Sequence, residues 1–462
     1  MLADRRIGIL VVHGVGEQKC FEHLEEIAGN LYNALAKDPA RQAHVQIGLG
    51  NQAPLHSPTW GWQETPASVR WRSELGGWIE AVFREVHWAD LDEPMTVRRW
   101  IDFVLWALAM PGVRPYNVSP ASVTQVGLRR LPRRLTRVET IRTRAELFGV
   151  SLLFLLILLS INLFNAVLAR LSIKLSPLEK AQETLYNFVG DVKLYQDWFV
   201  RMDNNLEAIG EKSRVAIRRR MVRALLRTAE AVRTGELDGY YIFAHSLGTV
   251  VAFNGLMELN GILPRYLTEE EWNGLNPVFK ASDQNQNLYD QAPRRPPWIQ
   301  PTDQIDRRQL FAGLRGFLTM GSPLDKFAAL WPLIVPINAQ PLPNPVPWVN
   351  VADRQDIVAG TIDLFSGTNN VGGLQLTNVP WADQVSPFTA HTSYWKVNAR
   401  NPDRLIDRLI PWLEGRPLVP PADRFPSFLA PGLFWLWILL SSGALLVLMG
   451  SGPWLLERMF DL

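Results

Sequence analysis

The chain of 462 residues has a single cysteine and almost no excess of charge of either sign. One cysteine, Cys20, cannot form an internal disulfide, and it has no CxxC partner that would suggest a metal or redox site. We therefore interpret Cys20 as a structural residue in a protein of a reducing compartment. The 47 basic and 45 acidic residues leave a formal net charge of +2, which argues against nucleic acid as the main partner.

The sequence also lacks the patterns typical of metal sites and of secreted proteins. It contains no HExxH motif and no Cys/His cluster, so we expect neither a metal nor another cofactor. The first six residues lead directly into the apolar run 7–12, without the cleavage site of a signal peptide. We accordingly expect the folded part of the chain to lie on the cytosolic side.

Two long uncharged stretches are present instead. Residues 147–169 are 23 consecutive positions without a charge, and residues 425–456 are 32. Because about 20 apolar residues suffice to cross a bilayer, both stretches predict contact with a membrane. We expect a C-terminal anchor at 425–462 and a re-entrant or interfacial helix at 147–169. Pairing of 147–169 with a second crossing is the other arrangement, but eight arginines between 114 and 146 favour the cytosolic side and so disfavour such a hairpin. A helix buried in the protein core is the alternative for both stretches.

Elsewhere, short apolar runs alternate with helical patterns, which predicts an α/β fold with a mostly parallel, doubly wound sheet. We expect the first part of its core at 1–98, a basic insertion at 99–173 and the rest of the core at 174–424. Within that last part, the polar, proline-rich stretch 262–308 is interpreted as a lid. Strands are expected at 7–12, 79–88, 240–243, 316–320 and 348–351, and helices at 21–36 and 249–259.

The pentapeptide Ala-His-Ser-Leu-Gly at 244–248 is the most informative motif. It lies between a predicted strand and a predicted helix, which is the setting of the nucleophile elbow in an α/β-hydrolase. Ser246 is therefore the candidate nucleophile, and the backbone N–H of Leu247 is a candidate donor to an oxyanion. The first position is alanine where glycine is usual, and a serine in an ordinary turn is the alternative.

Chain order selects the remaining catalytic candidates. In α/β-hydrolases the acid and then the base follow the nucleophile, and of seven histidines only His391 lies after Ser246 with room for an acid between them. Two aspartates follow the predicted strand 348–351, and we favour Asp356 over Asp353 as the residue that orients the base. His245 adjoins the serine, but we expect its side chain to leave the elbow in another direction.

The glycine-rich segment that follows the first predicted strand is a candidate oxyanion loop. It reads Val-His-Gly-Val-Gly at 12–16, and glycine lets such a loop turn its backbone amides inward. Gly14 and Val15 are the residues expected to supply the second oxyanion donor. A phosphate-binding loop is the alternative, but the spacing is not GxGxxG and no Lys-Ser/Thr pair follows.

Several motifs in this order resemble the lipase-like branch of the α/β-hydrolases, which includes the intracellular DDHD-type phospholipases A1 and the GPI inositol deacylases. The resemblance implies the α/β-hydrolase fold, with Ser246 as nucleophile, His391 as base and an aspartate within 350–358 as its orienter. The motifs are VVHGVG at 11–16, GDVKLY at 190–195, AHSLGT at 244–249, MGSPL at 320–324, NVADRQDIV at 350–358 and HTSYW at 391–395.

The residues and the resemblance together predict a membrane-anchored serine hydrolase that cleaves carboxylic esters, in the first place lipid acyl esters. Its expected partners are a lipid or ester substrate and the membrane, and its oligomeric state stays open. A tethered thioesterase or small-ester esterase is one alternative. A catalytically idle hydrolase fold that serves as a membrane scaffold is another.

Overall fold

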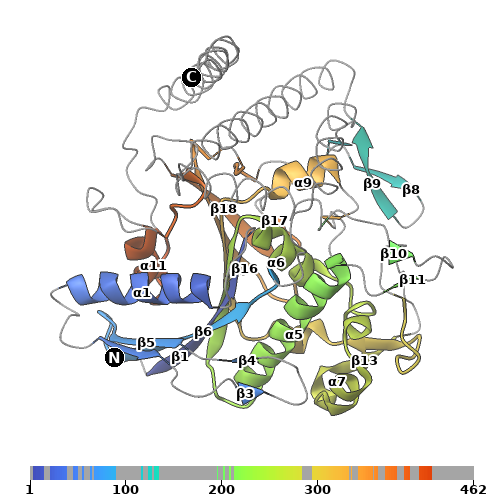
Figure 1. Ribbon diagram of the computed structural model, residues 1–462, viewed down its shortest axis with the longest axis horizontal. Helices are drawn as coiled ribbons and strands as arrows, with labels where there is room; N and C mark the ends of the chain where they lie inside the picture. Colours follow the sequence, from blue (N-terminus) through green and yellow to red (C-terminus); the bar gives the residue numbers. More distant parts are fainter. Residues whose placement is uncertain are drawn as a thin grey trace, which may run out of the picture.

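The computed structural model describes the greater part of the chain outside the two uncharged stretches (Figure 1). Residues 147–169, residues 425–462, Val15 and Cys20 all lie outside the described residues, so the predictions made for them stay predictions. The described residues are 4–14, 21–38, 45–49, 55–56, 63–64, 67–89, 116–117, 123–126, 129–134, 195, 201–202, 208–209, 213–283, 294–331, 334–335, 342–356, 358–362, 370–381, 390–395 and 405–418.

A nine-stranded, mostly parallel sheet organises the fold, in the order β17-β18-β16-β15-β12-β1-β6-β5-β2. The neighbours from β18 to β6 pair in parallel, whereas β17 runs antiparallel to β18, β5 to β6 and β2 to β5. The α/β class predicted from the sequence is therefore confirmed. The strands are β1 (Arg5–Val12), β2 (Gln46–Leu49), β5 (Ala67–Arg72), β6 (Trp78–Val86), β12 (Gly239–His245), β15 (Leu314–Met320), β16 (Val346–Asp353), β17 (Asn370–Val371) and β18 (Leu374–Trp381).

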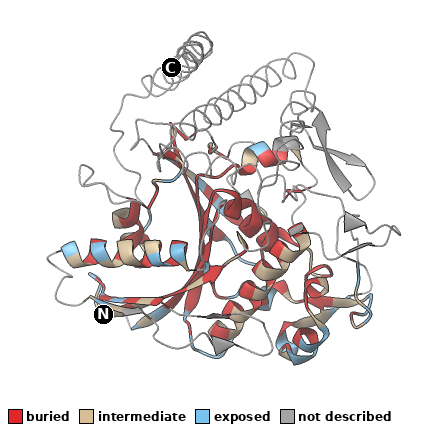
Figure 2. Ribbon diagram, in the orientation of Figure 1, coloured by how far each residue is buried: buried red, intermediate tan, exposed pale blue. Residues whose placement is uncertain are grey.

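Helices cover both faces of this sheet, and successive residues of a strand pack alternately against the helices of one face and of the other. On β1, Leu10 and Val12 pack in one hydrophobic cluster with α5 and α6, whereas Ile9 and Val11 pack in a second cluster with α1 and α11. This period of two is the pleat of a strand buried on both faces. Figure 2 shows the burial running through the central strands and α6. The helices are α1 (Glu22–Lys37), α5 (Ser213–Arg233), α6 (Leu247–Met257), α8 (Arg307–Leu310), α9 (Leu324–Leu330) and α11 (Leu405–Leu413).

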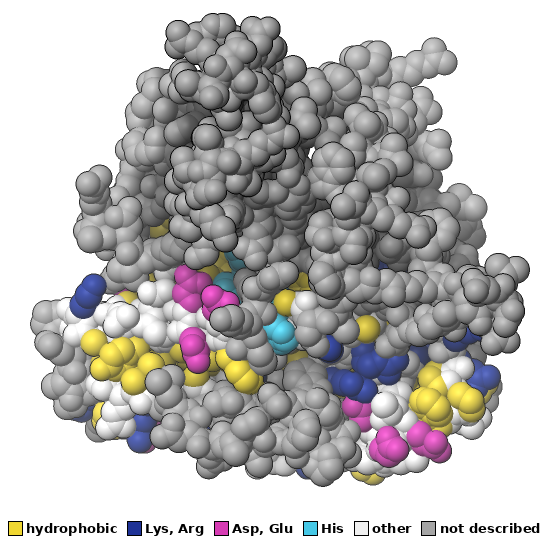
Figure 3. Space-filling view, in the orientation of Figure 1, with side chains coloured by type: hydrophobic (Ala, Val, Ile, Leu, Met, Phe, Trp, Pro, Cys, Tyr) yellow, Lys and Arg dark blue, Asp and Glu magenta, His cyan; other side chains and the backbone are white. Residues whose placement is uncertain are grey.

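The surface of the described part carries few large apolar side chains. Leu75 and Val278 are the large hydrophobic residues that are exposed among the described residues. In the space-filling view the apolar side chains form small groups between charged ones (Figure 3). Among the described residues no helix is both long and apolar enough to cross a bilayer.

The predicted lid, 262–308, has its described parts beside α5 and the C-terminal end of α6. Arg223 on α5 forms an ion pair with Glu271, and Arg307 donates hydrogen bonds to the carbonyl oxygens of Leu256 and Glu258. Since α6 is 11 residues, or about 16 Å, long, these contacts lie far from Ser246 at its other end. These contacts hold the C-terminal end of α6 in place. The role of 262–308 as a lid stays a prediction.

Several small elements complete the described secondary structure. They are η5 (Leu263–Tyr266), α7 (Glu269–Gly274), η6 (Pro277–Phe279), and the strand pairs or triplets β3 (Leu55–His56) with β4 (Gln63–Glu64), β7 (Tyr116–Asn117), β8 (Val123–Val126) and β9 (Arg129–Arg134), β10 (Arg201–Met202) with β11 (Ala208–Ile209), and β13 (Lys280–Ser282) with β14 (Asp303–Ile305).

A buried carboxyl group supports the start of α1. Glu85 on β6 accepts a hydrogen bond of 2.5 Å from the backbone N–H of Phe21, which adopts a left-handed φ of 70°. Its other oxygen has no hydrogen-bond partner among the described residues. Burial, together with the nearby charges of Glu25 and Glu22, raises the pKa of Glu85 to about 7.

The raised pKa of Glu85 predicts that the free energy of unfolding depends on pH. The unfolded chain releases the Glu85 proton near pH 4.5 and the folded chain near pH 7, so stability falls as the pH rises between these values. Glu85→Gln keeps an acceptor for Phe21 and removes the titration. We expect the free energy of unfolding of Glu85→Gln, relative to that of wild type, to rise by up to about 3 kcal/mol from pH 5 to pH 8, measured by denaturant unfolding. Glu270→Gln, at an exposed position of α7, controls for the change in net charge. Parallel stability profiles for wild type and Glu85→Gln would contradict the assignment.

Candidate active site

The strand–turn–helix around Ser246 is a sharp, strained elbow. β12 ends at His245 and α6 begins at Leu247, and Ser246 between them has φ 53° and ψ −131°. A non-glycine residue with positive φ is strained, and such residues gather at functional sites. The backbone N–H of Ser246 donates to the carbonyl oxygen of Met320, at 2.9 Å, which ties the turn to the end of β15.

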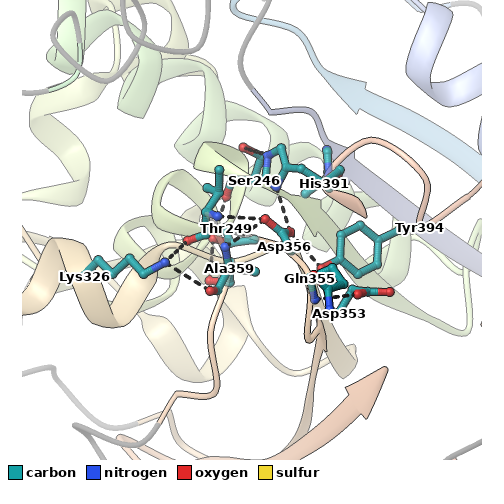
Figure 4. Close-up of polar contacts among 12 residues, drawn as sticks. Ser246, Thr249, Lys326, Asp353, Gln355, Asp356, Ala359, His391 and Tyr394 are labelled. Carbon is teal, nitrogen blue, oxygen red and sulfur yellow. Dashed lines mark hydrogen bonds and ion pairs between the residues drawn. The ribbon is translucent and has the colours of Figure 1, made fainter. Parts of the chain in front are cut away.

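Ser246, His391 and Asp356 form a continuous hydrogen-bonded chain (Figure 4). The Nε2 atom of His391 lies 2.8 Å from the Ser246 hydroxyl oxygen, and Nδ1 lies 2.8 Å from Oδ2 of Asp356. With Nδ1–H donating to the carboxylate, Nε2 is left as an acceptor for the serine hydroxyl. The three side chains come from the ends of β12 and β16 and from residues 390–395, which are far apart in the sequence.

The Asp356 carboxylate is buried and fully engaged. Oδ1 accepts the backbone N–H groups of Val358 and Ala359, at 2.8 and 3.1 Å, and Oδ2 accepts the Tyr394 hydroxyl at 2.9 Å. Burial raises the pKa of Asp356, but the charge of His391 and these hydrogen bonds outweigh burial and lower it to about 2. Asp356 therefore stays ionised over the whole physiological range.

The second candidate acid, Asp353, makes different contacts. Its Oδ1 accepts the backbone N–H of Gln355 at 2.8 Å, and its own backbone N–H donates to the Tyr394 hydroxyl at 2.9 Å (Figure 4). The Tyr394 hydroxyl thus joins the backbone of Asp353 to the carboxylate of Asp356. Of the two aspartates that the sequence left open, the structure brings Asp356 to the imidazole.

The glycine-rich loop after β1 lies directly against the nucleophile. A Cβ atom added at Gly14 would lie 2.5 Å from that of Ser246, and one added at Gly248 would meet the carbonyl oxygens of His13 and Val12. Only glycine allows this approach. Leu247 is the first residue of α6, so helix geometry gives its N–H no partner within the helix. Val15 lies outside the described residues.

The ring of His13 fixes this loop. Its Nε2 accepts the backbone N–H of Trp88 at 2.9 Å, so the proton lies on Nδ1, which donates to the carbonyl oxygen of Gly14 at 2.8 Å. The Trp88 indole stacks on the imidazole with ring centroids 4.9 Å apart. His13 is thus a part of the loop's framework.

Sequence reasoning missed three residues that position the acid and the base. Tyr394 bonds Asp356, and Gly321, with φ 60°, leaves room for the His391 ring. Lys326 donates to the carbonyl oxygens of Val358 and Ala359, at 2.9 and 3.1 Å, and so holds the turn whose N–H groups bind Asp356. Tyr394 and Gly321 stand in the motifs HTSYW and MGSPL, which were the available signal; nothing in the sequence pattern indicates Lys326.

The arrangement has the parts of a nucleophilic site and no metal centre among the described residues. A serine hydroxyl faces an imidazole acceptor, a buried carboxylate orients that imidazole, and glycine-lined backbone lies beside the serine. Such a set can activate a hydroxyl for attack on a carbonyl carbon.

Comparison with known proteins adds no match to this description. No protein-family model, no curated protein and no solved structure matches the chain.

The space left by Gly321 predicts a positioning effect. A Cβ atom at this position would lie 3.0 Å from Cε2 of Tyr394, and 3.1 Å from Cε1 and 3.2 Å from Nδ1 of His391. Gly321→Ala must therefore displace the imidazole, or the tyrosine ring beside it that bonds Asp356, by a few tenths of an ångström. We expect about a tenfold slower reaction of Ser246 with a fluorophosphonate probe, because small misplacements of reacting groups are costly. Gly235→Ala is the matched control, since Gly235 has φ 77° but nothing within 4 Å of an added Cβ. If Gly321→Ala labelled as fast as Gly235→Ala, the contact with the imidazole would not affect the reaction and the predicted positioning effect would be wrong.

Proposed function

We propose that this chain is a serine hydrolase of carboxylic esters with an α/β-hydrolase fold. The observation that carries the proposal is the chain of hydrogen bonds from Ser246 through His391 to Asp356 at a strained strand–helix turn. The nucleophile, acid and base follow one another in the order expected for this fold. The mostly parallel sheet with β12 near its centre is in keeping with it.

In the proposed reaction, the Ser246 hydroxyl oxygen attacks the ester carbonyl carbon while Nε2 of His391 takes the hydroxyl proton. Asp356 holds the imidazole in the tautomer that can accept this proton and stabilises the resulting imidazolium. The N–H of Leu247 and an amide of the loop at Gly14 or Val15 stabilise the oxyanion. The imidazolium then protonates the departing alcohol, and water releases the acyl group by the same steps.

We further propose that the substrates are lipid acyl esters and that the enzyme is anchored to a membrane with its site on the cytosolic side. This proposal is supported by the uncharged stretches 147–169 and 425–456 in the sequence. It also follows the motif resemblance to lipase-like hydrolases. The acyl length and the head group are left open.

Labelling with a fluorophosphonate probe tests the catalytic proposal. Wild type should label at Ser246, Ser246→Ala should not, and His391→Ala should react at least about 10³-fold more slowly because triad members act as a unit. Asp356→Asn should lose at least about 10²-fold, since the wrong tautomer is then favoured. Asp353→Asn, whose side chain bonds Gln355, should stay within a few-fold of wild type. Unlabelled wild type that is folded would refute the proposal and favour an idle scaffold.

A further inference from the structure

His245, the residue before the candidate nucleophile, makes a contact that the proposed reaction does not yet use. It is the last residue of β12 and is 9% exposed. Its Nε2 atom lies 2.8 Å from the backbone carbonyl oxygen of His391, and the two imidazole centroids are 5.0 Å apart. The side chain therefore reaches across the elbow to the segment that carries the candidate base.

This contact fixes the tautomer of His245. A carbonyl oxygen only accepts hydrogen bonds, so Nε2 must carry the proton and donate it. Nδ1 then has a lone pair, and it is buried without a hydrogen-bond partner among the described residues. A buried polar atom without a partner costs free energy, so packing alone would favour an apolar ring at this position.

The surroundings keep the ring neutral. Burial lowers the pKa of His245 well below its ordinary value, and the charges of His391 and His23 lower it further. The bond to the His391 carbonyl and the charge of Asp356 act in the opposite direction but are smaller. A neutral donor suits this place, because a second cation 5.0 Å from His391 would oppose its protonation during catalysis.

We propose that His245 is a positioning residue, which anchors the backbone of His391 through its Nε2–H and thereby sets the distance from the His391 imidazole to Ser246. The inference rests on the proposed function. The inference adds to that function a reason for the position of the base, because the segment 390–395 is then held at two points. Tyr394 binds the carboxylate of Asp356 from the same segment, and His245 binds the carbonyl of His391.

Three variants at position 245 separate the donor from the ring. His245→Phe keeps an aromatic ring without a donor. His245→Gln and His245→Met have similar length and volume, but only glutamine carries an N–H that can replace Nε2–H. We expect Phe and Met to slow fluorophosphonate labelling and kcat for a p-nitrophenyl ester about tenfold with KM little changed, and Gln to recover most of this loss. His23→Gln, at a neighbouring imidazole 5.7 Å from His245, is the control and should react as wild type does.

The outcomes distinguish this inference from the proposed function. If wild type labels and the Phe and Met variants label equally fast, His245 is only a core residue and the inference is wrong. If the Phe and Met variants fail to fold, the Gln variant decides. A folded Gln variant that labels about tenfold or more slowly than wild type would refute the donor role. Folded wild type that does not label refutes the proposed function, and the positioning role of His245 with it. Histidine-selective ¹⁵N NMR reads the contact independently. It should show His245 as the neutral Nε2–H tautomer at pH 6.5 and above, and an Nδ1–H or protonated ring there would overturn the inference.

Discussion

The candidate site depends on how closely the end of β1 approaches the start of α6. β1 and β12 are parallel neighbours with Val12 opposite Ala244, so the loops that follow them leave the sheet at the same edge and at the same height. Gly14 and Gly248 then allow backbone to lie directly against Ser246 and the first turn of α6. A side chain at either glycine would push the loop away from the serine. The close packing therefore places the backbone of the loop at Gly14 directly beside Ser246.

A negative charge and a neutral ring lie on different sides of the His391 imidazole. The Asp356 carboxylate, ionised because three hydrogen-bond donors and the imidazole favour its charged form, contacts Nδ1. On another side lies His245, which burial keeps neutral. A proton taken up at Nε2 thus meets a negative group across Nδ1 and no positive charge on His245. This asymmetry suits the role proposed for His391, in which the ring takes up a proton and becomes an imidazolium.

The parts of the fold and site that the sequence predicts are those with local signals. The central strands β1, β12, β15 and β16 are continuous apolar runs, whereas β5 and β2 lie toward the sheet edge and escaped prediction. β5, for example, alternates buried and exposed residues over only six positions. Chain order singles out His391, but Asp353 and Asp356 lie on one short segment that order cannot divide.

Some contacts at the site join residues far apart in the chain, and the sequence does not predict them. His245 bonds a carbonyl 146 residues later, and its adjacency to Ser246 says nothing about that contact. Lys326 likewise holds carbonyls more than 30 residues away. Such roles follow from the tertiary arrangement of the sheet and its loops, and no period or local motif encodes them.

A line of polar side chains in the sheet shows how the acid is held. Thr319 donates to Oδ1 of Asn350 at 2.9 Å, and Nδ2 of Asn350 donates to Asn378 at 2.9 Å and to the carbonyl oxygen of Gly360 at 3.1 Å. Asn378 in turn accepts the backbone N–H of Ile362 at 3.0 Å. Apolar residues would fill the same space at less desolvation cost, but they could not bind the loop backbone. The line crosses β15, β16 and β18 and ends on residues 358–362, whose first N–H groups bind Asp356. The hydrogen bonds of the Asn350 and Asn378 side chains offset the cost of removing these amides from water. The same bonds fix the loop 358–362, whose N–H groups keep the buried Asp356 carboxylate ionised.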